Sequence, residues 1–163
     1  MGLLNGVGLG ILFIGVLIGL AIVIMYLLNL QNALKEVSDE NRDVPAVNAW
    51  LLLIPFFTIV YAFIFYPKMS SSFKKEFEAR GFPAEGDYLK NLGIAYAILG
   101  AITALLNYSV SLSLQISGFF SLASIIVFIV LWVKAAKIKN ILKSTTRNES
   151  GEVSNNSKDL LDN

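Results

Sequence analysis

Residues 3–28 read LLNGVGLGILFIGVLIGLAIVIMYLL, and no charged side chain lies between Met1 and Leu34. An apolar run of about 20 residues is long enough to cross a bilayer as a helix. A cleaved secretory signal begins with basic residues, whereas the first Lys or Arg of this chain is Lys35. The stretch therefore predicts a retained membrane span, and the rest of the chain is interpreted from it.

The composition of the whole chain agrees with this start. The 163 residues are 55% hydrophobic and 15% charged. In soluble domains, about 45–50% of the residues are hydrophobic and about 25% are charged. Charged residues are also absent from residues 44–67 and 91–133. The chain is therefore predicted to be a polytopic membrane protein.

The expected fold is an all-α transmembrane four-helix bundle within residues 1–143. Its spans are predicted at residues 3–28, 47–66, 89–108 and 115–133, with an amphipathic cytoplasmic segment at residues 67–88. The remaining residues, 144–163, are polar and lack apolar periodicity, so a disordered tail is predicted there.

Local patterns refine these elements. Leu27, Leu30 and Leu34 recur at helical spacing, so the first helix is expected to continue beyond the membrane and to end within residues 38–45. Pro55, near the centre of the second span, predicts a bend. It is interpreted as a packing kink, with a functional hinge as the alternative.

The segment after the second span carries its own pattern. Phe73 and Phe77 share one face of the amphipathic segment, which predicts an interfacial helix. It is interpreted as a cytoplasmic extension of the second span whose phenylalanines rest on the bundle or on lipid headgroups, with a dedicated partner-binding helix as the alternative. Gly81 predicts where this helix stops.

Basic residues predict the orientation. Four spans place eleven Lys and Arg on the side of both termini and of residues 67–90, against Lys35 and Arg42 on the other side. Because cytoplasmic loops are enriched in Lys and Arg, both termini are expected in the cytoplasm. Anionic lipid is a candidate ligand of the basic residues that follow the fourth span: Lys134, Lys137, Lys139 and Lys143.

The chemistry of the chain is sparse. It contains no Cys and no His, which removes thiol nucleophiles, imidazole bases and most metal-ligand sets. Apart from Lys90 at the start of the third, no Asp, Glu, Lys or Arg lies within a predicted span, so proton relays and intramembrane catalysis are not indicated. The prediction is a non-enzymatic protein with no cofactor and no metal, and its net charge of +1 indicates no nucleic-acid partner.

Small residues at helical spacing are the main feature of the spans. Such stripes let helices approach closely in lipid. The candidate packing and oligomer residues are Gly8, Gly15, Gly19, Gly93, Ala97 and Gly100. Polar residues of the third and fourth spans are the candidate lining of a pore: Thr103, Asn107, Ser117, Ser121 and Ser124.

Several short motifs resemble those of a family of small bacterial four-span membrane proteins of unknown function. They are LxxLQxAL at residues 27–34, ENR at 40–42, PxxxxWLLLIPxF at 45–57, EFxxRG at 76–81, LGxAY at 92–96 and WVK at 132–134. The resemblance implies four spans and a location in the bacterial inner membrane. It implies no activity, cofactor or catalytic residue.

The expected function is that of a small self-associating or accessory subunit of a membrane complex, with a second copy or a larger membrane protein as its partner. The alternative is a homo-oligomeric channel or small-solute transporter lined by the polar residues of the third and fourth spans.

Overall fold

The computed structural model describes residues 6–54, 56–83, 86–108 and 114–145, and all regular structure in these ranges is helical. The elements are α1 (Gly6–Lys35), the 3-10 helix η1 (Ala46–Leu53), α2 (Phe57–Ala79), α3 (Lys90–Tyr108) and α4 (Leu114–Ser144). The predicted all-α class is confirmed, whereas most of the predicted tail lies outside the described residues.

Two helices of the described part are long and apolar enough to cross a membrane by length and composition. These stretches are Gly8–Lys35 in α1 and Gly118–Ser144 in α4. The apolar stretch of α3, Lys90–Leu106, is shorter.

The apolar face predicted at the end of the first helix is confirmed. Leu27, Leu30 and Leu34 are all at most 1% exposed. The helix itself ends at Lys35, before the predicted residues 38–45. The three leucines pack because residues three and four apart lie on one side of a helix. This face contacts η1 and α4.

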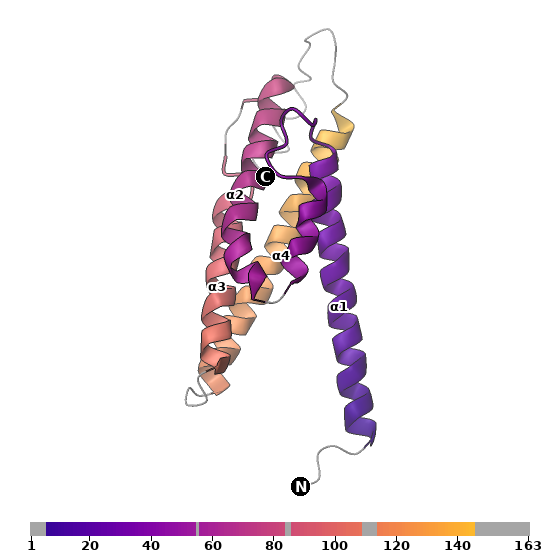
Figure 1. Ribbon diagram of the computed structural model, residues 1–163, viewed down its shortest axis with the longest axis vertical. Coiled ribbons are helices and arrows are strands. Elements are labelled where there is room, and N and C mark those ends of the chain that lie inside the picture. The colour runs from indigo at the N-terminus through magenta and orange to yellow at the C-terminus, as the bar shows by residue number, and fades with distance from the viewer. Residues whose placement is uncertain (1–5, 55, 84–85, 109–113, 146–163) are drawn as a thin grey trace.

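The second predicted span is not a single helix. η1 ends where the N–H of Ile54 donates to the carbonyl oxygen of Leu51 at 3.3 Å, and α2 starts after Phe56, whose φ is 63°. Instead of a bend near Pro55, the chain reverses direction, so η1 and α2 form a hairpin (Figure 1). A positive φ at a bulky residue is rare and turns the chain sharply.

The predicted continuity between the second span and the amphipathic segment is confirmed, because α2 runs without interruption through Pro67. The predicted stop at Gly81 is confirmed. The N–H of Gly81 donates to the carbonyl oxygen of Glu78, and the N–H of Phe82 donates to the carbonyl oxygen of Phe77, both at 3.0 Å. Gly81 has a φ of 80°. This is the paired hydrogen bonding of a Schellman cap, which needs a residue that tolerates positive φ.

The connection at residues 36–45 and the described parts of the next connection, residues 80–83 and 86–89, lie at the same end of the molecule (Figure 1). The N–H of Asp43 donates to Ser72 Oγ at 2.8 Å, and Lys75 Nζ donates to Asp43 Oδ1 at 2.5 Å. The predicted four-span arrangement placed these two connections on opposite sides of the membrane, and these contacts make that placement wrong. The reason is the reversal between η1 and α2, which returns the chain to the end of the molecule at which residues 36–45 lie.

The C-terminal end of α4 reaches this same end, because Arg80 Nη1 donates to the carbonyl oxygen of Thr145 at 2.9 Å. The first turn of α1 and the last turn of α4 therefore lie at opposite ends of the molecule (Figure 1). The termini themselves, residues 1–5 and 146–163, lie outside the described residues, so the location predicted for both in the cytoplasm stays a prediction. We call the end built from residues 36–45, 80–83 and 86–89 and from the last turn of α4 the charged end.

The core lies toward the charged end. Its largest side chains come from α2 and include Phe65, Tyr66, Phe73 and Phe77, each at most 1% exposed. The Tyr26 and Tyr66 hydroxyls are hydrogen-bonded at 2.9 Å, which satisfies two buried polar groups with one contact. Close packing of α3 on α2 depends on Gly93, because a Cβ at this position would collide with the side chain of Tyr66.

We expect Gly93→Ala to destabilise the fold by about 1–3 kcal/mol through overpacking against Tyr66. Gly100→Ala on the same helix is the matched control, since nothing lies within 4 Å of a Cβ at Gly100. That change should be neutral or stabilising, because Ala is the better helix former. Thermal unfolding of both variants in mild detergent measures the difference, and equal effects would contradict the close approach at Gly93.

Candidate functional site

The charged end contains a hydrogen-bonded cluster centred on the carboxylate of Glu76, which is 4% exposed. Glu76 Oε2 accepts from the Ser38 N–H at 3.0 Å, from Ser38 Oγ at 2.5 Å and from Asn41 Nδ2 at 2.8 Å. Glu76 Oε1 accepts from Arg80 Nε at 2.9 Å. The carboxylate therefore holds the connection after α1 against α2.

Arg80 extends this cluster to the other helices. Its Nη2 donates to the carbonyl oxygen of Glu36 at 2.8 Å, and its Nη1 donates to the carbonyl oxygens of Leu142 and Thr145. Carbonyl groups at helix C-termini carry partial negative charge and lack partners within the helix, so a guanidinium satisfies them well. One side chain thus joins the C-terminal ends of α1, α2 and α4.

Arg42 closes the end of α1 in the same way. Its Nε donates to the carbonyl oxygen of Leu34 at 2.9 Å and its Nη2 to that of Val37 at 2.5 Å. Its Nη1 pairs with Asp39 at 2.6 Å, although the Asp39 side chain is 91% exposed. Because exposed ion pairs contribute little, the bonds to Leu34 and Val37 matter most.

The surroundings of Glu76 favour its charged form. Burial by itself raises the pKa of this carboxyl, but hydrogen bonds from Asn41, Ser38 and Arg80 together lower the pKa from 4.5 to about 2. The pKa of Asp43 is also lowered, mainly by its hydrogen bond with Lys75 and secondly by Ser71. Neither group is positioned as a proton donor or acceptor near neutral pH.

The cluster is structural in its chemistry. Both oxygens of Glu76 are engaged by protein donors, and the described residues contain no group of three or more His, Cys, Asp or Glu that could hold a metal ion. The ENR and EFxxRG motifs supply Asn41, Arg42, Glu76, Arg80 and Gly81. Their side chains join segments that are far apart in the sequence. The spacing of the residues within each motif could not predict these contacts.

Replacing Glu76 by Gln should remove the negative charge and leave Arg80 without its buried partner. Breaking a buried pair costs roughly 3–5 kcal/mol, so Tm in mild detergent should fall by on the order of 10 °C. Glu78→Gln, an exposed position on the same helix, should leave Tm nearly unchanged. An unaltered Tm for Glu76→Gln would show that the cluster does not hold the helices together.

Stability should also depend on the protonation of Glu76. Because the pKa of this carboxyl is ordinarily 4.5 and is lowered to about 2 in the fold, the unfolded chain takes up the proton first as the pH falls. The stabilisation is therefore complete above about pH 5 and is lost progressively between about pH 4.5 and pH 2. Tm measured against pH should decline less steeply in this window for Glu76→Gln than for Glu78→Gln, and parallel curves would contradict the assignment.

The glycines predicted to pack in the first span do not pack within the chain. Residues 9–22 of α1 are all exposed, and nothing lies within 4 Å of a Cβ built at Gly10, Gly15 or Gly19. Gly8 is only partly exposed. Figure 1 shows this part of the helix standing apart from the others. We call residues 9–22 the exposed half of α1.

The predicted small-residue stripe on α3 divides between two environments. Gly93 and Ala97 are buried, whereas Gly100 has nothing within 4 Å of a Cβ. The stripe therefore packs against the core at its beginning and leaves it before Gly100.

Two of the candidate pore-lining residues form hydrogen bonds within their own helices. Thr103 Oγ1 donates to the carbonyl oxygen of Leu99 at 2.8 Å, and Ser124 Oγ to that of Phe120 at 2.9 Å. Each bond lies within one helix, as is common for Ser and Thr in apolar surroundings. Ser121 is partly buried, and the side chains of Asn107 and Ser117 lie outside the described residues.

The basic residues after the fourth predicted span differ in exposure. Lys134 and Lys143 are exposed, and Lys137 is partly buried. Lys139 Nζ donates to Asn29 Oδ1 at 3.1 Å, and Asn29 Nδ2 donates to the carbonyl oxygen of Trp132 at 3.3 Å. Lys139 therefore joins α4 to α1.

Phe73 and Phe77, predicted to rest on the bundle or on lipid headgroups, are fully buried within the protein. Phe77 stacks on Tyr88 with ring centroids 5.2 Å apart. The neighbouring Lys74 is exposed, so the two faces of this part of α2 differ in polarity. The apolar face contacts the chain itself.

These features define a helical protein with two candidate membrane-spanning helices, a polar cluster that fastens one end, and an unpartnered half-helix at the other. Comparison of the chain with models of known families, with curated proteins and with solved structures finds no match.

Proposed function

We propose that the protein is a non-enzymatic integral membrane protein that acts as a small self-associating or accessory subunit of a membrane complex. The observation that carries the proposal is the exposed half of α1. It is apolar on every side and contains Gly10, Gly15 and Gly19 with nothing packed on them.

The glycines support a helical partner. Within a helix each Gly costs about 1 kcal/mol relative to Ala. Lipid provides no compensation, since Leu or Ile would fit hydrocarbon without that cost, whereas a second helix gains contact energy where small residues let the backbones approach. We therefore assign the glycine face of α1 to a second copy of this chain or to a helix of a larger membrane protein.

The location is proposed to be the bacterial inner membrane. It is supported by the length and apolar character of α1 and α4 and by the motif resemblance. The lipid bilayer then surrounds the apolar helices. The exposed Lys134 and Lys143 are suited to bind anionic headgroups at the surface of the bilayer.

The absence of an enzymatic role is likewise a proposal. It is supported by the engagement of Glu76 and Arg80 in bonds that fasten the helices. The alternative of a channel is not taken further, because the hydroxyls of Thr103 and Ser124 bond within their own helices.

Replacing Gly15 and Gly19 together by Leu should weaken the association about tenfold or more, which corresponds to about 1.4 kcal/mol. The space around both positions means that the fold of a single chain should be unchanged. Light scattering in mild detergent measures the mass, and affinity purification identifies a partner that is lost.

The matched control is Ile11→Leu with Ile18→Leu, which changes exposed residues of the same half-helix without filling a glycine position. It should leave the mass and any partner unaltered. A wild-type protein that is monomeric and partner-free would overturn the proposal.

A further inference from the structure

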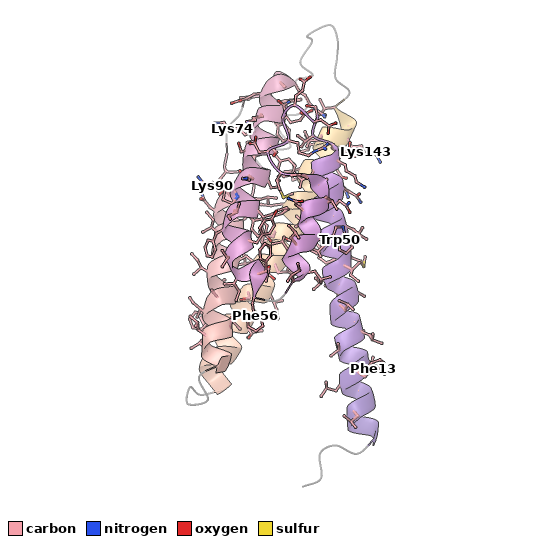
Figure 2. The ribbon with its side chains drawn as sticks, viewed as in Figure 1. Phe13, Trp50, Phe56, Lys74, Lys90 and Lys143 are labelled. Carbon is pink, nitrogen blue, oxygen red and sulfur yellow. The ribbon has the colours of Figure 1, made fainter. Side chains whose placement is uncertain are left out.

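Charge is divided sharply along the long axis of the molecule. In Figure 2, Lys74, Lys90 and Lys143 lie in the upper part, and Phe56 and Phe13 lie below them. The lower part is built from described residues that belong to the uncharged sequence segments, residues 1–34, 44–67 and 91–133. They include nearly all of α1, the turn between η1 and α2, most of α3 and the first two thirds of α4.

We infer that α1, α3 and α4 cross the membrane, and that η1 and α2 form a re-entrant hairpin that enters and leaves the bilayer at the charged end. The partner of the hairpin tip is the hydrocarbon of the bilayer. This inference concerns the placement of one chain in lipid and does not rest on the proposed self-association.

The depth of the hairpin follows from helix geometry. The uncharged part of α2 runs from Phe57 to Tyr66, and at 1.5 Å per residue this distance is about 14 Å. The hydrocarbon core of a bilayer is about 30 Å thick. The hairpin therefore reaches about the middle of the bilayer, whereas a crossing requires about twice this length. The 19 residues of α3, by contrast, extend about 28 Å.

The tip of the hairpin has the surface of a membrane-inserted element. Phe56 is 84% exposed and Val60 is 67% exposed, and Ile54 and Phe57 are exposed beside them. Removing a large apolar side chain from water is worth about 1.5–3 kcal/mol. Hydrocarbon around the tip accounts for this cluster of exposed apolar groups.

Two backbone N–H groups at the tip are paired within the hairpin. In hydrocarbon, unpaired backbone groups are costly, so a break between helices must satisfy them internally. The N–H of Ile54 donates to the carbonyl oxygen of Leu51, and the N–H of Thr58 donates to that of Ile54 at 3.0 Å. Pro55 has no N–H to satisfy.

The orientation follows from the same arrangement. The eleven Lys and Arg of the described residues lie from Lys35 to Arg42, from Lys68 to Lys90 and from Lys134 to Lys143, in segments at or next to the charged end. Arg147 and Lys158 follow α4 in sequence. Neither the residues before α1 nor those between α3 and α4 contain Lys or Arg, so the charged end is cytoplasmic and the chain enters α1 from outside.

Single-cysteine labelling tests the arrangement, because the protein has no Cys of its own. Glu40→Cys and Glu78→Cys, both at exposed positions, should react with a membrane-impermeant maleimide in inverted vesicles and not in intact cells. A cysteine in a short tag placed before Met1 should react in intact cells. Labelling of Glu40→Cys from outside and of Glu78→Cys from inside would overturn the hairpin in favour of four crossings, and outside labelling of both would overturn the orientation.

The depth of the tip is tested separately in vesicles. A bimane fluorophore on Phe56→Cys should be quenched by lipids brominated on their acyl chains, and the same fluorophore on Glu78→Cys should not. Strong maleimide labelling of Phe56→Cys from either side, or equal quenching at both positions, would overturn insertion of the tip.

Discussion

The carboxylate of Glu76 and the guanidinium of Arg80 are the contact on which the rest of the architecture depends. Together they hold Ser38 and Asn41 of the first connection, the C-terminal end of α1 through the carbonyl oxygen of Glu36, and the last turn of α4. Each accepting carbonyl at a helix end lacks a partner within its own helix. A single buried pair therefore holds the C-terminal ends of α1, α2 and α4 next to one another.

This fastening at one end explains the uneven distribution of the core. Near the cluster, Leu30, Leu34, Phe73 and Phe77 are fully buried, and the glycine at position 93 lets α3 approach Tyr66. Away from it, α1 departs from the other helices (Figure 1). The chain thus has a well-packed half that needs no partner and an apolar half whose surface is available to lipid or to another helix.

The proposed function and the inferred membrane placement use different parts of this apolar half. Self-association concerns the exposed half of α1, whereas the re-entrant hairpin concerns the turn between η1 and α2. The two are physically compatible, since a hairpin that reaches only the middle of the bilayer leaves the first turns of α1 uncovered by its own chain. A second helix with close contacts at Gly15 and Gly19 would cover that surface.

The sequence by itself determined the helical class, the buried face of α1 and the end of α2 at Gly81. These depend on local periodicity and on backbone conformations that particular residues favour. It could not determine the path between residues 44 and 67, because an uncharged run broken by proline is equally consistent with one kinked span and with a hairpin of two short helices. The tertiary structure decided between them: Asp43 meets Lys75 and Ser38 meets Glu76, and these contacts bring together residues more than 30 positions apart. Pairing between such distant polar groups follows from the packing of the helices and leaves no periodic pattern in the sequence. The contacts of the charged end could therefore be identified only from the tertiary structure.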